Sequence, residues 1–150
     1  MRRVWYVGVS GLVSLMSVVG CASIKPPAMY VEGLHVGKPH ITGIPVEVRF
    51  RVQNPNPDDL VVDKVEYQLI LNGVRLGRGY VAEGFDLRGF GQEHVRSQFQ
   101  LNLLSLPAGV REILAHDRVK ARAKGKFYVR RDGSRQEIGF TSEADVLLTR

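Results

Sequence analysis

Few side chains in this sequence are of the types that carry out chemistry, and their spacing does not assemble a familiar site. The four histidines are spread along the chain, outside the helical or Cys-x-x-Cys context in which proteins bind metals; they are His35, His40, His94 and His116. There is no Gly-x-Ser-x-Gly elbow, and the Ser, His and Asp residues show no triad arrangement. We therefore expect surface or turn histidines, no metal site, no cofactor and no enzymatic activity.

Two further motifs resemble chemistry but have the wrong context. The segment 77–82 reads Gly-Arg-Gly-Tyr-Val-Ala, a loose dinucleotide-binding pattern, yet it lies in a predicted hairpin with no following helix to bind a pyrophosphate. Asp58 and Asp59 are adjacent carboxylates on a predicted turn, where neighbouring side chains usually point apart into water. Neither motif is interpreted as a site.

Cys21 is the only cysteine and cannot form an intramolecular disulfide. It ends an uncharged stretch, Val4–Ile24, that follows Arg2 and Arg3, which is the layout of a secretory signal. Val-Val-Gly-Cys at 18–21 resembles the bacterial lipobox, with Val18 where that motif usually has Leu. The resemblance implies that Cys21 receives diacylglycerol and becomes the new N-terminus.

This interpretation predicts a signal peptide over residues 1–20, a lipidated cysteine and tether over 21–29, and a folded domain over 30–150. Several acyl chains would hold the protein stably on a membrane. Ala22 follows the cysteine in place of the Asp that usually retains lipoproteins at the inner membrane, so we expect export to the periplasmic face of the outer membrane. The alternatives are a retained bilayer-spanning helix, cleavage a few residues later, or an unmodified buried cysteine.

The composition fits one domain. A chain of 150 residues that is 44% hydrophobic and 24% charged can bury one core and is too short for two. Its 21 Lys and Arg and 15 Asp and Glu give +6, which falls to +4 without Arg2 and Arg3, an excess too mild to indicate nucleic acid. We expect a monomer.

Side chains that alternate between apolar and polar dominate the chain after the tether. From Val46 to Val52 every even position is apolar, and every odd position from Glu47 is charged, as in a half-buried strand. Asn-Pro-Asn-Pro at 54–57 then ends the strand. Another alternating run covers 95–103, after a glycine-rich connection from Gly84 to Gly91, and Pro107 with the spacing of Val110, Ile113 and Leu114 predicts one short helix.

Two Xxx-Gly turns predict hairpins. Asn72-Gly73 favours a two-residue type I′ turn, and the pairs expected around it are Leu71 with Val74, Leu69 with Leu76, and Val65 with Tyr80. Asp132-Gly133 favours a second such turn, with expected pairs Phe127 with Ile138, Gly125 with Phe140, Arg122 with Glu143, Lys120 with Asp145, and Val119 with Val146. Short strands with little helix predict an all-β fold, an antiparallel β-sandwich of the immunoglobulin or fibronectin type III kind with one short helix.

Several of these motifs together resemble a known family. Asn54-Pro55-Asn56-Pro57 after an alternating strand, then Asn72-Gly73, with Gly79 soon after, is similar to the water stress and hypersensitive response domain, which the late embryogenesis abundant type 2 proteins share. The resemblance covers roughly 29–148. It implies a fibronectin type III-like fold, a link to desiccation and other stress, and no known active site. Bacterial members are often lipoproteins, in agreement with the reading of Cys21.

A basic stripe is the remaining candidate surface. Alternate positions of one predicted strand are basic and would project from one face; they are Arg118, Lys120, Arg122, Lys124, Lys126 and Arg130. The stripe is a candidate contact for anionic lipid headgroups or a phosphorylated glycan, with nucleic acid the weakest option. The alternative is a solvated face that blocks edge pairing, since Arg122 and Lys120 have predicted acidic partners.

The sequence therefore predicts an envelope-anchored, non-catalytic module that protects or binds membranes or client proteins during stress. The alternative function is a structural or accessory subunit of a cell-envelope complex, docked through a sheet edge or the outward Ile70 region.

Overall fold

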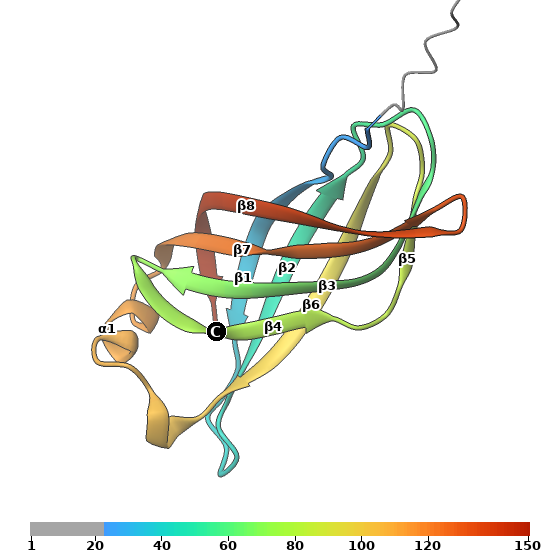
Figure 1. The fold of residues 1–150 in the computed structure, drawn as a ribbon. Coiled ribbons are helices and arrows are strands. Elements are labelled where there is room, and N and C mark those ends of the chain that lie inside the picture. The colour runs from blue at the N-terminus through green and yellow to red at the C-terminus, as the bar shows by residue number, and fades with distance from the viewer. Residues whose placement is uncertain (1–22) are drawn as a thin grey trace, which may run out of the picture.

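The computed structural model describes residues 23–150, so Cys21 and the expected signal peptide lie outside the described residues. This part of the chain is mostly β-structure with one short α-helix, as the sequence predicts (Figure 1). Its elements in chain order are β1 (Ala28–Val36), β2 (Ile44–Gln53), β3 (Leu60–Leu71), β4 (Val74–Val81), β5 (Phe85–Leu87), β6 (Gln92–Leu101), a 3-10 turn (Leu103–Ser105), α1 (Val110–Leu114), β7 (Arg118–Arg131) and β8 (Ser134–Thr149).

The strands form one curled sheet of mixed direction. Their order is β4-β3-β7-β8-β1-β2-β6, and β5 pairs with the beginning of β3. Neighbours are antiparallel except β8 and β1, which run parallel where Leu148 pairs with Leu34 and Thr149 with His35. The structure therefore has one curled sheet of mixed direction in place of the predicted sandwich of two antiparallel sheets. β8 continues two residues past its last pair with β7, and these two residues join both halves into a single sheet.

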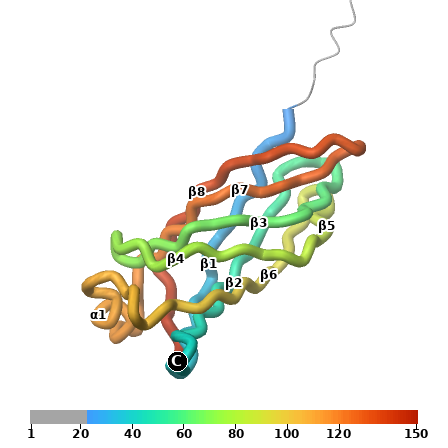
Figure 2. The backbone as a smooth tube through the Cα atoms, turned by 60° about the horizontal axis from the view of Figure 1, so that its bottom comes forward, coloured from blue at the N-terminus to red at the C-terminus, as the bar shows by residue number. Residues whose placement is uncertain are grey.

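The curl brings the two ends of this strand order together around the core. The Ser97 hydroxyl of β6 donates a hydrogen bond to the Tyr80 carbonyl of β4 over 2.9 Å, and the Tyr67 hydroxyl of β3 donates to Ser97 over 2.8 Å. Figure 2 shows the strands wrapping around a common interior. The alternation in β2 is confirmed, because Val46, Val48, Phe50 and Val52 are all at most 1% exposed and face this interior.

The β7–β8 hairpin has the predicted register throughout. Asp132 and Gly133 take positive φ angles of 50° and 78°, as the turn requires. Every expected pair is observed: Phe127 with Ile138, Gly125 with Phe140, Arg122 with Glu143, Lys120 with Asp145, and Val119 with Val146. The Phe140 ring also lies over the hairpin and packs on Phe127, with 4.8 Å between ring centroids.

The β3–β4 hairpin keeps its predicted turn but not its predicted register. Leu71 pairs with Val74 as expected, whereas Leu69 pairs with Gly77 and Val65 with Val81, because a β-bulge adds Leu76 to β4. The bulge changes which side chains of β4 face the core: Val81 is buried and Tyr80 is 61% exposed. Without it, Arg78 would lie opposite the buried Tyr67, where no water would solvate its charge.

Three smaller features complete the comparison with the sequence. The short helix is confirmed as α1. The connection 84–91 contains β5, whose Leu87 is fully buried and pairs with Leu60. β1 begins at Ala28, two residues before the expected start of the domain, because the Met29 side chain is part of the core at 3% exposure. In residues 23–150 there is no helix with the length and apolarity needed to cross a bilayer.

Candidate functional surfaces

The asparagines of the Asn-Pro motif build a buried polar cluster at one end of the sheet. Asn54 is fully buried, and its side-chain amide donates to the carbonyls of Asp58, Leu87 and Arg88 over 2.8–3.2 Å. Its Oδ1 accepts hydrogen bonds from the main-chain and side-chain nitrogens of Asn56, both at 2.9 Å. Both polar atoms of its side chain therefore have partners within the protein, which a buried amide requires.

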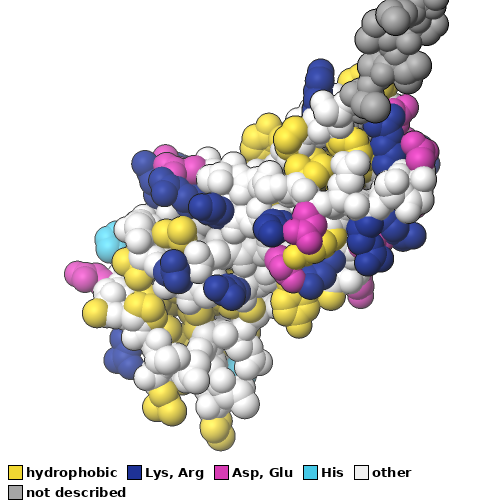
Figure 3. All heavy atoms as spheres, in the orientation of Figure 1, with side chains coloured by type: hydrophobic (Ala, Val, Ile, Leu, Met, Phe, Trp, Pro, Cys, Tyr) yellow, Lys and Arg dark blue, Asp and Glu magenta, His cyan; other side chains and the backbone are white. Residues whose placement is uncertain are grey.

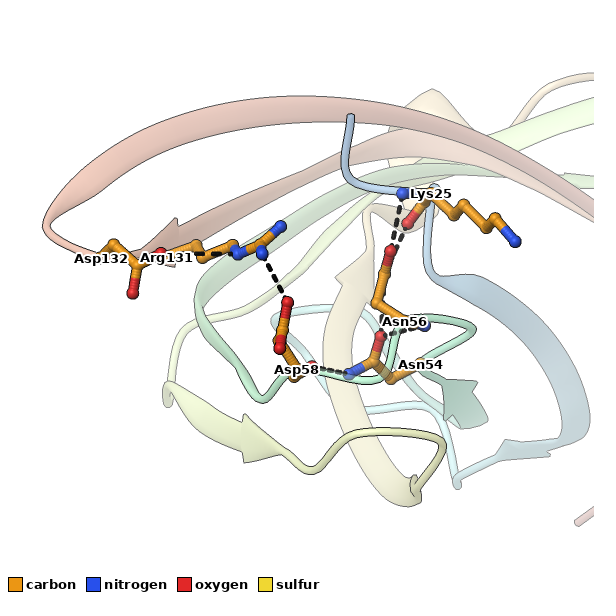
Figure 4. A network of polar contacts seen from close by, with 6 residues as sticks. All are labelled: Lys25, Asn54, Asn56, Asp58, Arg131 and Asp132. Atoms are coloured by element: carbon orange, nitrogen blue, oxygen red, sulfur yellow. Dashed lines mark hydrogen bonds and ion pairs between the residues drawn. The ribbon is translucent and has the colours of Figure 1, made fainter. Parts of the chain in front are cut away.

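Asn56 holds the N-terminal segment against this cluster. The Lys25 main-chain N–H donates to Asn56 Oδ1 over 2.8 Å, and Asn56 Nδ2 donates to the Lys25 carbonyl over 2.9 Å (Figure 4). The amide thus pairs with the Lys25 backbone in the way that a neighbouring strand would. We call Lys25, Asn54 and Asn56 the asparagine clasp. Its function in the structure is to fix the point at which the chain enters the domain.

The loop 88–91 lies against the clasp and presents an aromatic ring to solvent. The Phe90 N–H donates to the Asn56 carbonyl over 2.9 Å, and the Asn54 N–H donates to the Gly91 carbonyl over 2.9 Å. Phe90 is 70% exposed and has a φ of +54°, an unusual conformation for a bulky side chain. Gly89 permits the close approach of this loop, since a Cβ there would overlap the Pro57 carbonyl. In the sequence this loop is visible only as an Arg-Gly-Phe-Gly run, which belongs to the segment interpreted as a glycine-rich connection between strands.

The tip of the β7–β8 hairpin joins the same end of the molecule. Arg131 forms an ion pair with Asp58, next to the clasp, and a longer one of 3.6 Å with Asp132 (Figure 4). The sequence placed Asn54, Pro55, Asn56 and Pro57 in a family motif without assigning them a role. The structure brings them together with Lys25 and the hairpin tip. The other motif pair, Asn72 and Gly73, lies elsewhere, in the β3–β4 turn.

The basic stripe is confirmed as one exposed face of β7, but most of its charges are compensated. All six side chains are exposed on alternate positions. Four have carboxylate partners: Lys120 and Arg122 with Glu143, Lys126 with Glu137, and Arg130 with Asp63. Lys120 contacts Glu143 at 3.6 Å although Asp145 is its strand partner. On the face shown in Figure 3, basic and acidic side chains lie in several mixed groups.

A shallow hollow crosses the middle of the stripe. Its volume is about 570 Å³, and its lining includes Arg78, Tyr80, Lys124 and Lys126. Beside it, the Glu66 carboxylate accepts hydrogen bonds from Lys64 and Tyr128, which lower the pKa of Glu66. The bond to Glu66 raises the pKa of Tyr128. Opposite charges are thus interleaved here, so the hollow offers few uncompensated cations to an anionic ligand.

The histidines lie apart from one another in the structure. His94 contacts Glu32 at 2.9 Å, His35 contacts Thr149 at 3.2 Å, and His116 bonds the Glu112 carbonyl at 2.8 Å, all at the surface. Over residues 23–150 no group of three or more His, Cys, Asp or Glu side chains is arranged to hold a metal ion. The four histidines therefore lie outside the apolar interior.

Two surfaces were not anticipated from the sequence. β8 pairs with β1 at two residue pairs alone in the described structure, and a cleft of about 430 Å³ opens between them, lined by 26–30 and 139–143. At the end that carries α1, a groove of about 570 Å³ is lined largely by apolar side chains such as Ile44, Leu103 and Leu114. Ile41 and Leu104 are fully exposed near this groove. Periodicity could not predict either surface, because both depend on how distant strands diverge.

Comparison with solved structures defines the class of fold. A protein from Arabidopsis thaliana, solved in solution, matches with a TM-score of 0.66 at 11% identity, covering 96% of this chain and 93% of its own. A crystal structure of a protein from Archaeoglobus fulgidus matches at 0.46 and 16% identity, covering 83% and 97%. A late embryogenesis abundant protein solved in solution matches at 0.49 and 11%, covering 82% and 71%. The chain thus shares the small, β-rich fold of the Arabidopsis protein.

The family follows from the sequence itself. The family model for late embryogenesis abundant proteins of the LEA_2 type matches residues 49–143, which is more than half of the chain. The protein therefore belongs to the LEA_2 family, as the Asn-Pro and Asn-Gly motifs predicted. No curated protein sequence matches it.

Proposed function

We propose that this protein is a lipoprotein, anchored to the cell envelope through Cys21, whose LEA_2 domain acts without catalysis as a protective or binding module during desiccation and related stress. Family membership is the observation that carries the stress-related part. The interior supports the absence of catalysis, because it is filled by aliphatic and aromatic side chains and Tyr67 is the one titratable side chain among the buried core residues of 23–150. The lipobox-like segment at Cys21 supports the anchor.

Lipidation is tested by the intact mass of protein extracted from membranes. The expected mass is that of a chain beginning at Cys21 and carrying diacylglycerol. Cys21→Ser is the matched control and should accumulate unprocessed or in the soluble fraction. An unmodified Cys21 in membrane-extracted protein would rule the anchor out.

Protection is tested by drying a labile enzyme with and without the purified protein and measuring the activity recovered on rehydration. The control is Phe50→Asp, which places a charge at a fully buried position and should unfold the domain. We expect the folded protein to preserve severalfold more activity than this variant. Equal protection by both would mean that any added polypeptide suffices and that the LEA_2 domain has no specific role.

The basic stripe is the proposed contact with anionic lipid or glycan; Arg118 and Lys124 have no carboxylate partner in residues 23–150, whereas Lys126 and Arg130 pair with Glu137 and Asp63. Replacing Lys124, Lys126 and Arg130 by Ser should weaken binding to vesicles that contain anionic lipid at low salt. The control removes three exposed cations from other strands and α1, Arg75, Arg96 and Arg111, with the same change in net charge. If binding is unchanged by the first substitution, or is lowered equally by both, the stripe is not a specific contact for anionic lipid or glycan.

The second candidate function is an accessory subunit of an envelope complex. The observation that favours it is the diverging edge of β8, since a strand with unpaired N–H and C=O groups can accept an extended segment of a partner. A photo-crosslinker at Thr141 on this edge should then capture one fixed partner in intact cells, and a crosslinker at Arg75 on β4 should not. Capture of many unrelated proteins at Thr141 would favour client binding instead.

A further inference from the structure

We propose that the clasp end of the domain rests on the membrane, with the Phe90 ring in the headgroup layer and the α1 end directed away from it. The clasp end comprises the asparagine clasp, the loop 56–59 and the loop 88–91. The inference rests on the proposed lipidation of Cys21 and adds to it an orientation and a contact residue. The partner is the lipid surface to which the protein would be anchored.

The first support is the short length of chain between the anchor and the domain. Both main-chain groups of Lys25 are bonded to Asn56, at 2.8 and 2.9 Å, so the domain begins to hold the chain there. Lys25 comes four positions after Cys21 in the sequence. An extended chain spans at most about 3.3–3.6 Å per residue, so the clasp cannot lie more than ~14 Å from the lipidated residue. Figure 1 shows α1 at the opposite end of the strands.

The second support is the way in which the same clasp holds Phe90. Asn56, which binds Lys25 through its side chain, accepts the Phe90 N–H through its carbonyl. A further hydrogen bond, from the Gly91 N–H to the Arg88 carbonyl over 2.9 Å, closes the loop. The exposed ring is therefore held at a fixed place beside the entry point of the anchor. Membrane-surface segments bury apolar side chains such as Phe at the boundary between headgroups and acyl chains, and the bilayer would cover a ring that is 70% exposed.

The third support is the charge beside the ring. The side chains of Lys25 and Arg88 are exposed, and neither forms an ion pair with any acidic group of residues 23–150. Long cationic side chains around an inserted aromatic can reach lipid phosphates. Arg131, by contrast, is already paired with Asp58. Asp59 lies at the same end, where its carboxylate accepts the Gly89 N–H over 2.8 Å. Among the side chains outside the ion pairs of residues 23–150, this end therefore joins one apolar ring with two cations and one carboxylate, and the stripe on β7 is largely compensated.

The competing orientation places the α1 end on the membrane. Ile41 and Leu104 are more exposed than Phe90, so exposure alone would favour that end. The anchor decides against it, because the end that contacts lipid must lie within ~14 Å of Cys21. The clasp satisfies this condition, and Phe90 lies beside the clasp through its bond to Asn56, the residue that holds Lys25.

The test uses a single tryptophan as a depth probe. Trp5 is the only tryptophan in the chain, so a Trp5→Phe background carries none. Phe90→Trp and the matched control Ile41→Trp are each placed in this full-length background, purified from membranes and reconstituted in vesicles with or without brominated lipids. We expect blue-shifted emission and at least twofold quenching by brominated lipid for Phe90→Trp, and water-like, unquenched emission for Ile41→Trp.

The possible outcomes separate the orientation from the anchor. Intact mass is measured on the same samples, so that lipidation is known for each. Diacylglycerol on Cys21 with no quenching of Phe90→Trp, or with stronger quenching of Ile41→Trp, would overturn the orientation and leave the anchor intact. A mass without lipid would overturn both. Quenching of Phe90→Trp that persists at high salt would support insertion of the ring over a purely electrostatic contact.

Discussion

The hairpins β3–β4 and β7–β8 have the same kind of turn, but their strands pair differently beyond it. Asn72-Gly73 and Asp132-Gly133 both take two consecutive positive φ angles. β7 and β8 then pair without interruption from Arg131 and Ser134 to Arg118 and Leu147, whereas β3 and β4 shift register within three pairs of the turn. Turn chemistry therefore fixes the first pairs of a hairpin, and packing decides whether the register continues.

The packing that shifts β4 comes from the other half of the curled sheet. Gly77 lies against the Phe99 ring, with 3.1 Å from a Cβ built there to the ring, and Gly79 lies against Tyr67. The bulge places these two glycines where side chains from β6 and β3 need room, and turns Arg78 outward. β7 meets no such obstacle, because both of its neighbours, β3 and β8, pair with it in plane.

The largest expected effect comes from filling the close contact in each hairpin. A Cβ at Gly125 of β7 would overlap the Glu66 main-chain oxygen, and a Cβ at Gly79 of β4 would overlap the Tyr67 side chain. Backbone in the middle of a sheet cannot move aside, so Gly125→Ala should lower the free energy of unfolding by about 3 kcal/mol and Gly79→Ala by about 1–2 kcal/mol. Chemical denaturation of both variants measures the difference.

Gly139→Ala is the control for these substitutions, since a Cβ there would come no closer than 3.9 Å to the Gly125 oxygen. It should change stability by less than about 0.5 kcal/mol. If Gly79→Ala proved more costly than Gly125→Ala, the edge strand would be the more tightly constrained of the two, contrary to the comparison.

The side chain that lies over Gly79 should make stability depend on alkaline pH. Burial raises the pKa of Tyr67 to about 12, and the hydrogen bond with Ser97 offsets this in part. The unfolded chain therefore loses the phenolic proton near pH 10, before the folded chain does. Stability from this group is complete below pH 10 and is lost as the pH rises toward 12, by roughly 2 kcal/mol.

Tyr67→Phe provides the test, because it removes the titrating group and leaves the ring that packs against Phe50. Between pH 10 and 12 the unfolding free energy should fall less steeply with pH in this variant. The difference in slope should correspond to the release of about one proton on unfolding. Parallel curves for the two proteins would show that Tyr67 titrates normally. At neutral pH the variant should lose about 1 kcal/mol, from the missing bond to Ser97.

Substitution of the first turn residue should affect stability differently in the two hairpins, although the backbone conformations of the two turns agree. Asn72 Oδ1 accepts a hydrogen bond from the Lys120 N–H over 2.8 Å, so the β3–β4 turn is tied to β7. Asp132 makes only the 3.6 Å contact with Arg131 among the ion pairs and side-chain hydrogen bonds of residues 23–150. Glycine tolerates positive φ, so Asn72→Gly should cost about 1 kcal/mol more than Asp132→Gly, as measured by thermal unfolding. Equal costs would mean that the bond from Asn72 to β7 contributes nothing to stability.

The features that the sequence predicted are those set by local effects, and the features that it missed are set by distant contacts. The register of β7–β8, the inward face of β2 and the short helix were predicted, because each depends on a turn or a period within one segment. The parallel join of β8 to β1 and the bulge in β4 were missed, since both arise from contacts between strands far apart in the chain.

The candidate surfaces divide in the same way. The basic stripe was predicted from alternation, and its carboxylate partners Glu137 and Asp63 were not. Asn54 and Asn56 were recognised as a motif, but a motif does not show that one of them binds the backbone of Lys25. Cys21 lies outside the described residues, and its lipidation stays a prediction.

The smallest expected effect concerns the charges that line β7–β8. Arg122 Nε donates to Glu143 over 2.7 Å, and this bond, with the nearby positive charge, lowers the pKa of Glu143. The pair is exposed, so its contribution is present above the ordinary glutamate pKa, is lost as the pH falls through the lower folded value, and weakens with salt. NMR titration of the Glu143 carboxyl should show a pKa below the ordinary glutamate value of 4.5, and Arg122→Gln should raise that pKa toward it. No ion pair joins β3 to β4 in the described structure, so the stability of that hairpin should not respond to salt in this way. An Arg122→Gln titration that superimposes on the wild type would show that Arg122 does not stabilise the charged form of Glu143, and that this pair does not distinguish the two hairpins.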